Sequence, residues 1–276
     1  MNTTVKRTIF GILFLAVMLG GLLFHEAAFG LLFLFISVWM LREFYAMNLG
    51  ESLKGLQYAA LVAGAALFML GFCYFRGWVS LPVYLGGGMG AALLLMCLAV
   101  LTYEPEAFPR FAFILAGQLY VSLPLSLSPA LVFRGGVFSG LLLVAFFCII
   151  WASDVGAYCL GMLLGQKLWP ARLCPRISPK KSWAGFVGGL LFACLAGAIL
   201  FWTGLLQLPI GHCLCLAAVM HVLGVFGDLF ESLWKRTSGV KDSGNLIPGH
   251  GGLLDRFDSA LFAIPAACIY LEIFGL

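Results

Sequence analysis

The chain has 276 residues, of which 62% are hydrophobic and only 10% are charged, and its mean hydropathy is +1.04. Because soluble domains carry about 25% charged residues, this composition excludes an ordinary soluble protein and predicts a polytopic membrane protein. The net charge of +4 does not indicate a nucleic-acid partner, since cations in membrane proteins chiefly report topology.

Apolar stretches long enough to approach a bilayer crossing, which takes about 20 residues, recur along the whole chain. The predicted fold class is therefore all-α, with about nine transmembrane helices and no soluble domain. Residues 1–135 form an N-terminal region of about five spans, and residues 136–276 a C-terminal region that carries the polar motifs. The predicted spans are residues 9–24, 27–41, 56–75, 82–101, 111–133, 137–164, 183–206, 209–233 and 257–274.

Three of these spans have special features. Residues 9–24 resemble a signal peptide, but no small-residue cleavage site follows, so we expect a first transmembrane helix. This span and the next are short. The sixth span is long and contains Asp154 and Gly156, so we expect it to break or to project beyond the bilayer.

The basic residues predict the orientation of the chain. When nine spans alternate across the membrane, only Arg76 and Arg134 of the 16 Lys and Arg residues fall on the side opposite the N-terminus. The positive-inside rule then places the N-terminus in the cytoplasm and the C-terminus outside. The polar blocks 167–181 and 235–256 both fall on the cytoplasmic side, where nucleotides and magnesium are found.

A polar stripe follows the apolar part of the eighth span. Asp228, Glu231, Ser232 and Lys235 lie at offsets 0, 3, 4 and 7, which places them on one face of a helix. A solvated helix end with a local salt bridge is the plain structural reading. Charges next to hydrocarbon are costly, however, and oxygen ligands beside an ammonium suit Mg²⁺ and a phosphate.

The loop that follows is rich in glycine. Gly251 and Gly252, like the glycines before them, let backbone amides approach an anion closely, although a tight turn between spans also explains them. Three side chains around them predict phosphate contact; they are Lys241, His250 and Arg256.

Two further carboxylates, Asp255 and Asp258, lie three residues apart at the start of the last span. Capping of a helix N-terminus explains them structurally. Together with Asp228 they also form a set of three carboxylates that could hold one or two Mg²⁺ ions for phosphoryl or nucleotidyl transfer.

An upstream block supplies Asp154, an acid within an apolar segment, and the run from Ser178 through Lys180 and Lys181 to Ser182. An acid in such a segment faces protein, water or a cation rather than lipid. The lysines fit a phosphate clamp or ordinary positive-inside anchors, and the sequence leaves both open.

Other polar residues are interpreted as structural. His221, like His25 and His212, is isolated and has no metal-ligand spacing. The charges within residues 42–54, and Glu104 and Glu106, are expected to be solvated loop residues. Glycines such as Gly64, Gly188 and Gly189 are expected to permit close helix packing.

The C-terminal motif resembles the signature of the phosphatidate cytidylyltransferases, or CDP-diacylglycerol synthases. Residues 151–161 and 177–185 resemble upstream motifs of the same family, so the resemblance covers about the C-terminal half. The chain departs from the family pattern at Val155, Met162, Ser182 and Ala184. The residues that carry the resemblance are Ser232, Lys235, Arg236, Lys241, Asp242, Gly244, Ile247, Pro248, His250, Gly251, Gly252, Asp255, Arg256 and Asp258.

The resemblance implies a reaction of CTP with phosphatidic acid that yields CDP-diacylglycerol and pyrophosphate in phospholipid biosynthesis. It implies a requirement for one or two Mg²⁺ ions, with a monovalent cation as a further candidate, and a homodimer in a bacterial-type inner or plasma membrane. Asp228, Asp255 and Asp258 would serve the metal, with Asp154 and Glu231 as further candidates. Other implied site residues are Lys235 and Arg236 near the phosphates, and Ser178, Lys180, Lys181, Ser232, Lys241, His250, Gly251, Gly252 and Arg256 at the substrates.

Two other functions are weighed against this one. A CTP-using polyprenol or dolichol kinase would transfer a different phosphate, to a hydroxyl acceptor. An ion-coupled transporter would also place acids in the membrane, but transporters commonly show internal repeats, and no repeat is found.

Overall fold

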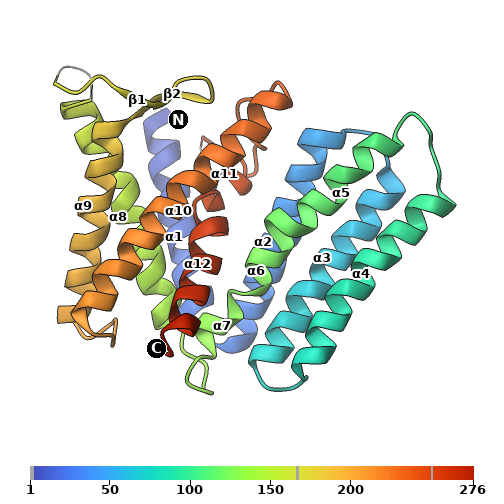
Figure 1. The fold of residues 1–276 in the computed structure, drawn as a ribbon, viewed down its shortest axis with the longest axis horizontal. Helices are drawn as coiled ribbons and strands as arrows, with labels where there is room; N and C mark the ends of the chain where they lie inside the picture. The colour runs from blue at the N-terminus through green and yellow to red at the C-terminus, as the bar shows by residue number, and fades with distance from the viewer. Residues whose placement is uncertain (1–2, 166–167, 250) are drawn as a thin grey trace. The chain divides into compact units, whose positions relative to one another are not determined.

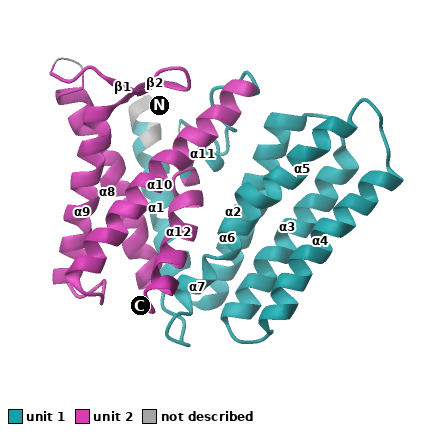
Figure 2. Ribbon diagram, viewed as in Figure 1, with its two compact units in different colours: residues 1–140, 238–256 teal, residues 141–237, 257–276 magenta. Residues whose placement is uncertain are grey.

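The structure is a computed structural model that describes residues 3–165, 168–249 and 251–276, and it is mostly helical (Figure 1). The chain forms two compact units (Figure 2). Unit 1 combines residues 1–140 with residues 238–256, and unit 2 combines residues 141–237 with residues 257–276. The segment 238–256 therefore packs with the N-terminal helices, whereas the predicted division into residues 1–135 and 136–276 remains a prediction.

Unit 1 contains long helices joined by short turns, and α2, α3 and α4 lie side by side (Figure 1). Gly64 of α3 lies against α2 and η2, where an added Cβ would come within 2.7 Å of Leu41 and 2.6 Å of Ser122. The expected packing role of this glycine is confirmed. The elements are α1 (Thr3–Leu23), α2 (Glu26–Leu49), α3 (Lys54–Phe75), α4 (Leu81–Leu101), η1 (Phe108–Arg110), α5 (Phe111–Gly117), the π-helix η2 (Gln118–Ser122), α6 (Leu123–Ser126) and α7 (Pro129–Val132).

The fifth predicted span is a series of short helical pieces rather than one regular helix. Pro124 and Pro129 each lack a backbone N–H group, so the α-helical hydrogen-bond ladder cannot continue through them. Gln118 lies where α5 passes into the π-helix and donates to the carbonyl of Ala60 at 2.7 Å and to the hydroxyl of Tyr45 at 3.1 Å. These side-chain hydrogen bonds tie the irregular segment to α2 and α3.

Unit 2 packs α8 closely on α9 and α10 on α12. An added Cβ on Gly188 would lie 2.7 Å from the carbonyl oxygen of Gly156, so these glycines bring the backbones of α8 and α9 together, as expected. The elements are α8 (Leu141–Leu163), β1 (Arg172–Cys174), β2 (Ser178–Ser182), α9 (Trp183–Trp202), α10 (Ile210–Thr237), α11 (Leu254–Phe257, at the border with unit 1) and α12 (Ala260–Ile273).

The predicted multi-pass membrane character is confirmed, with differences in individual spans. Seven helical segments among the described residues are long and apolar enough to cross a membrane, and Thr8–Leu23 is a shorter apolar helix. The last predicted span corresponds to α12, which has 14 residues, so the count of nine crossings stays a prediction. The second span is longer than expected, since α2 continues to Leu49, and α8 shows no break, because Gly156 serves close packing.

Candidate functional site

The polar stripe of the C-terminal motif lies on the last turns of α10, as predicted, because one helix continues from the apolar Ile210 to Thr237. The hydroxyl of Ser232 donates to Asp228 Oδ1 at 3.3 Å. Lys235 Nζ lies 3.3 Å from Glu231 Oε1, and both side chains are buried. Each charge of this buried ion pair needs its partner, because an isolated charge in this environment would be costly. Arg236, the next residue, is exposed.

A short hairpin brings the upstream basic segment to this stripe. Strand β2 pairs antiparallel with β1, and Ser182 at its end accepts a hydrogen bond from the N–H of Gly185 at 3.1 Å, which caps α9. Lys181 Nζ lies 2.6 Å from Asp228 Oδ2. This ion pair joins two motifs separated in sequence, so Lys181 belongs to the same cluster as Asp228. Ser178 is half-buried and Lys180 is exposed on the same strand.

Asp258 adds a further carboxylate to the cluster within unit 2. Gly224 and Gly227 of α10 lie against the backbone of residues 258 and 259, and an added Cβ on Gly227 would come 2.4 Å from the carbonyl oxygen of Asp258. Asp258 is half-buried there and close enough to Asp228 and Asp154 to feel their negative charges, which Lys235 partly offsets. The small glycines thus allow the close approach of these acids.

The glycine-rich loop lies in unit 1, where its own carboxylate organises it. Asp255 Oδ2 accepts hydrogen bonds from the N–H of Ser243 at 3.0 Å and of Gly252 at 2.8 Å. Gly251 has a φ of +84°, which a residue with a side chain rarely adopts. Because the N–H of Gly252 is bonded within the loop, the expected phosphate contact of the loop stays a prediction.

Lys241 and Arg256 are exposed. His250 lies outside the described residues, and its phosphate contact stays a prediction.

The acids fit the chemistry of Mg²⁺ without forming a complete protein cage. No group of three or more His, Cys, Asp or Glu side chains is arranged to hold a metal ion within residues 3–165, 168–249 and 251–276. Mg²⁺ commonly takes only one or two carboxylates and completes its shell with substrate phosphates and water. Asp228 and Asp258 supply oxygen donors of that kind.

Glu43 and His221 both lie in buried polar contacts. The expectation that Glu43 is a solvated loop residue is wrong, because it is a buried residue of α2 that accepts hydrogen bonds from the loop 243–254. His221 lies two helical turns before Asp228, and its Nδ1 is 2.7 Å from the hydroxyl of Ser153. This buried contact is consistent with the interpretation of His221 as structural, whereas no local pattern in the sequence marks Glu43 as buried.

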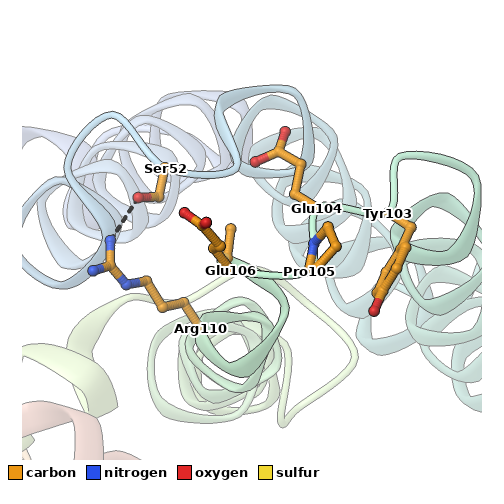
Figure 3. A pocket seen from close by; sticks show the side chains of 7 residues that line it. Ser52, Tyr103, Glu104, Pro105, Glu106 and Arg110 are labelled. Carbon is orange, nitrogen blue, oxygen red and sulfur yellow. Dashed lines mark hydrogen bonds between the residues drawn. The ribbon is translucent and has the colours of Figure 1, made fainter.

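A pocket of unit 1 is lined by none of the predicted site residues (Figure 3). Arg110 donates to the hydroxyl of Ser52 at 2.6 Å on one side of it, and Glu104 and Glu106 project from the loop after α4. Both glutamates are exposed, which confirms their interpretation as solvated loop residues.

Comparisons with known proteins agree with the motifs. The model of the Cytidylyltransferase family matches residues 5–274. A phosphatidate cytidylyltransferase of Staphylococcus epidermidis is 34% identical over 264 residues, which is 94% of each chain. That of Staphylococcus haemolyticus is 32% identical over 96% of this chain and 98% of its own, and that of Bacillus subtilis is 38% identical over 67% of each. The resemblance is confirmed over nearly the whole chain, which belongs to the cytidylyltransferase family.

Proposed function

We propose that the chain is a phosphatidate cytidylyltransferase, which converts CTP and phosphatidic acid into CDP-diacylglycerol and pyrophosphate. An oxygen of the lipid phosphate attacks the α-phosphorus of CTP, a new P–O bond forms, and the bond to the β-phosphate breaks as pyrophosphate leaves. The observation that carries the proposal is the cluster of Lys181, Asp228 and Lys235 in a chain of this family.

The chemical difficulty of this reaction is charge rather than proton transfer. The attacking lipid phosphate is already an anion, so no strong general base is needed, but it must approach a polyanionic triphosphate. Lys181, Lys235 and Arg236 would neutralise and align these phosphates. Further substrate contacts are proposed for Ser178, Lys180, Ser232, Lys241, His250, Gly251, Gly252 and Arg256.

Asp228, Asp255 and Asp258 would hold Mg²⁺, with Asp154 and Glu231 as further candidates. When bound, one or two Mg²⁺ ions supply positive charge to the attacking and leaving oxygens. Asp228 and Asp258 supply carboxylate oxygens, and their negative charges repel each other. A cation bound at this end of α10 would relieve that repulsion, which supports the proposal. A monovalent cation and a homodimer are part of the same proposal by family resemblance.

One substrate is soluble and the other is a membrane lipid, so the reaction belongs at a membrane surface. We place it on the cytoplasmic face of a bacterial inner or plasma membrane, because the positive-inside rule puts both polar blocks there.

Labelled CTP tests the proposal directly. Purified protein with phosphatidic acid, Mg²⁺ and CTP labelled at the α-phosphate is expected to move the label into lipid and to release pyrophosphate. Asp258→Asn is the matched control and should move no label while remaining folded, as judged by its circular dichroism and gel-filtration profile. Label that stays in released CDP, with none in lipid, would instead indicate a lipid kinase. Absence of any lipid product with the wild-type protein would favour the transporter.

A further inference from the structure

Glu43, near the C-terminal end of α2, is a buried carboxylate surrounded by hydrogen-bond donors. Only 6% of the residue is exposed. Its Oε1 accepts from the indole N–H of Trp39 at 3.0 Å and from the N–H of Leu253 at 3.1 Å. Its Oε2 accepts from the N–H of Leu254 at 2.8 Å and lies 3.4 Å from the donating hydroxyl of Ser243. Three of these four donors belong to the glycine-rich loop, so the loop is anchored on α2 within unit 1.

The loop is also shaped to receive this carboxylate. A Cβ added to Gly244 would lie 2.5 Å from Glu43 Oε1, and one added to Gly252 would lie 2.6 Å from Oε2. Real Cβ atoms essentially never come this close to another heavy atom. Both glycines therefore stand where the backbone must approach Glu43.

Charge gives the reason for a glutamate at this position. An apolar side chain would fill the space at lower cost, because a carboxylate loses its hydration when it is buried. That cost is offset only by strong donors, and hydrogen bonds to a carboxylate are about twice as strong as those between neutral groups. Four such donors converge here, which holds the backbone of residues 253 and 254 in one position.

Ser243 connects this anchor to Asp255. The hydroxyl of Ser243 donates to Glu43, and the N–H of the same residue donates to Asp255 Oδ2. Asp255 also follows directly after Leu254, whose N–H is bound by Glu43. The side chain of Asp255 is thus oriented from both ends of the loop by contacts that begin at Glu43.

We infer that Glu43 is a positioning residue for nucleotidyl transfer, which holds the loop 243–254 so that Asp255 and Arg256 meet the metal and the nucleotide. This inference rests on the proposed function for its kinetic consequence. The structural part, the anchoring of the loop by Glu43, stands on the contacts alone.

The test compares Glu43→Gln with Glu51→Gln. Glutamine keeps the shape of Glu43 but turns one acceptor into a donor, which faces the N–H groups of the loop. Glu51 is exposed and pairs with Lys54 after the end of α2, so its change controls for the loss of one charge. Ser243→Ala is a second variant that removes only the bridging hydroxyl and does not depend on the folding of Glu43→Gln.

Two measurements are made on each full-length protein in nanodiscs. Hydrogen exchange of residues 243–256 is expected to accelerate in Glu43→Gln and, less strongly, in Ser243→Ala, but not in Glu51→Gln. The value of kcat/KM for CTP is expected to fall about tenfold or more in Glu43→Gln, less in Ser243→Ala and not in Glu51→Gln. Glu43→Gln is also expected to need a higher Mg²⁺ concentration for its half-maximal rate.

Unchanged exchange in both Glu43→Gln and Ser243→Ala would overturn the anchoring. Faster exchange with an unchanged Mg²⁺ dependence would overturn the positioning role and leave Glu43 a structural residue. A wild-type protein that transfers no CMP to lipid would defeat the proposed function instead, and the exchange measurement would still decide the anchoring.

Discussion

At the scale of single residues, the neighbouring lysines of strand β2 have different surroundings. Lys181 forms an ion pair with Asp228 at 2.6 Å, whereas Lys180 is exposed. We expect Lys181→Ala to lower kcat by about 100-fold, because it removes a charge positioned at the proposed phosphate site. Lys180→Ala, the matched control, should lower it by less than about tenfold, since an exposed charge interacts weakly. Steady-state rates of CMP transfer at saturating Mg²⁺ measure both variants. Equal losses would contradict the distinction between the two lysines, and unchanged rates in both would favour a topological role for the pair.

Contacts between residues on one helix face could be predicted from the sequence, whereas contacts between distant segments could not. The offsets of Asp228, Glu231, Ser232 and Lys235 identify one helix face because they depend only on helical periodicity. The role of Glu43 could not be predicted, since Leu254 lies 211 positions away in sequence. A single charge in a predicted loop gives no sign of a partner so distant.

At the scale of elements, the contact between α8 and α9 depends on glycine. We expect Gly188→Ala to destabilise the protein by about 1–3 kcal/mol, because the new Cβ would meet Gly156 O at 2.7 Å and the Leu160 Cβ at 2.6 Å. Gly90→Ala is the matched control, since no atom lies within 4 Å of its added Cβ. It should leave stability unchanged or raise it by about 0.5–1 kcal/mol, as alanine favours helix. Thermal unfolding in detergent measures both, and equal midpoints would contradict close packing at Gly188.

Hydropathy predicts long helices better than the elements between them. The apolar run before Asp228 identifies α10, and the structure continues that helix to Thr237. The β1–β2 hairpin has only three and five residues per strand, and its register depends on tertiary contacts rather than on alternation. The π-helix η2 likewise follows from the packing of Gln118 against α3, which hydropathy does not report.

At the scale of the whole molecule, side-chain contacts within unit 1 agree with the alternation of spans. Arg76 binds Glu26 at 2.7 Å, and Arg110 binds Ser52 at 2.6 Å. The predicted topology places the first pair together on the outer side and the second pair together on the cytoplasmic side. If one of the two spans between the members of a pair failed to cross, those two residues would lie on opposite sides of the membrane and could not make this contact.

The orientation itself is a prediction that fusion proteins can test. With nine crossings and a cytoplasmic N-terminus, green fluorescent protein fused after residue 240 should fluoresce, whereas alkaline phosphatase fused after residue 205 or residue 276 should be active. The positions 205 and 240 flank α10, which is long enough to span by itself, so they calibrate the two reporters in one chain. The fusion at residue 276 then reports α12, whose 14 residues are short for a bilayer. A fluorescent fusion at residue 276 would mean that α12 does not cross the membrane and that the C-terminus is cytoplasmic. The proposed site at the end of α10 would still lie on the cytoplasmic side.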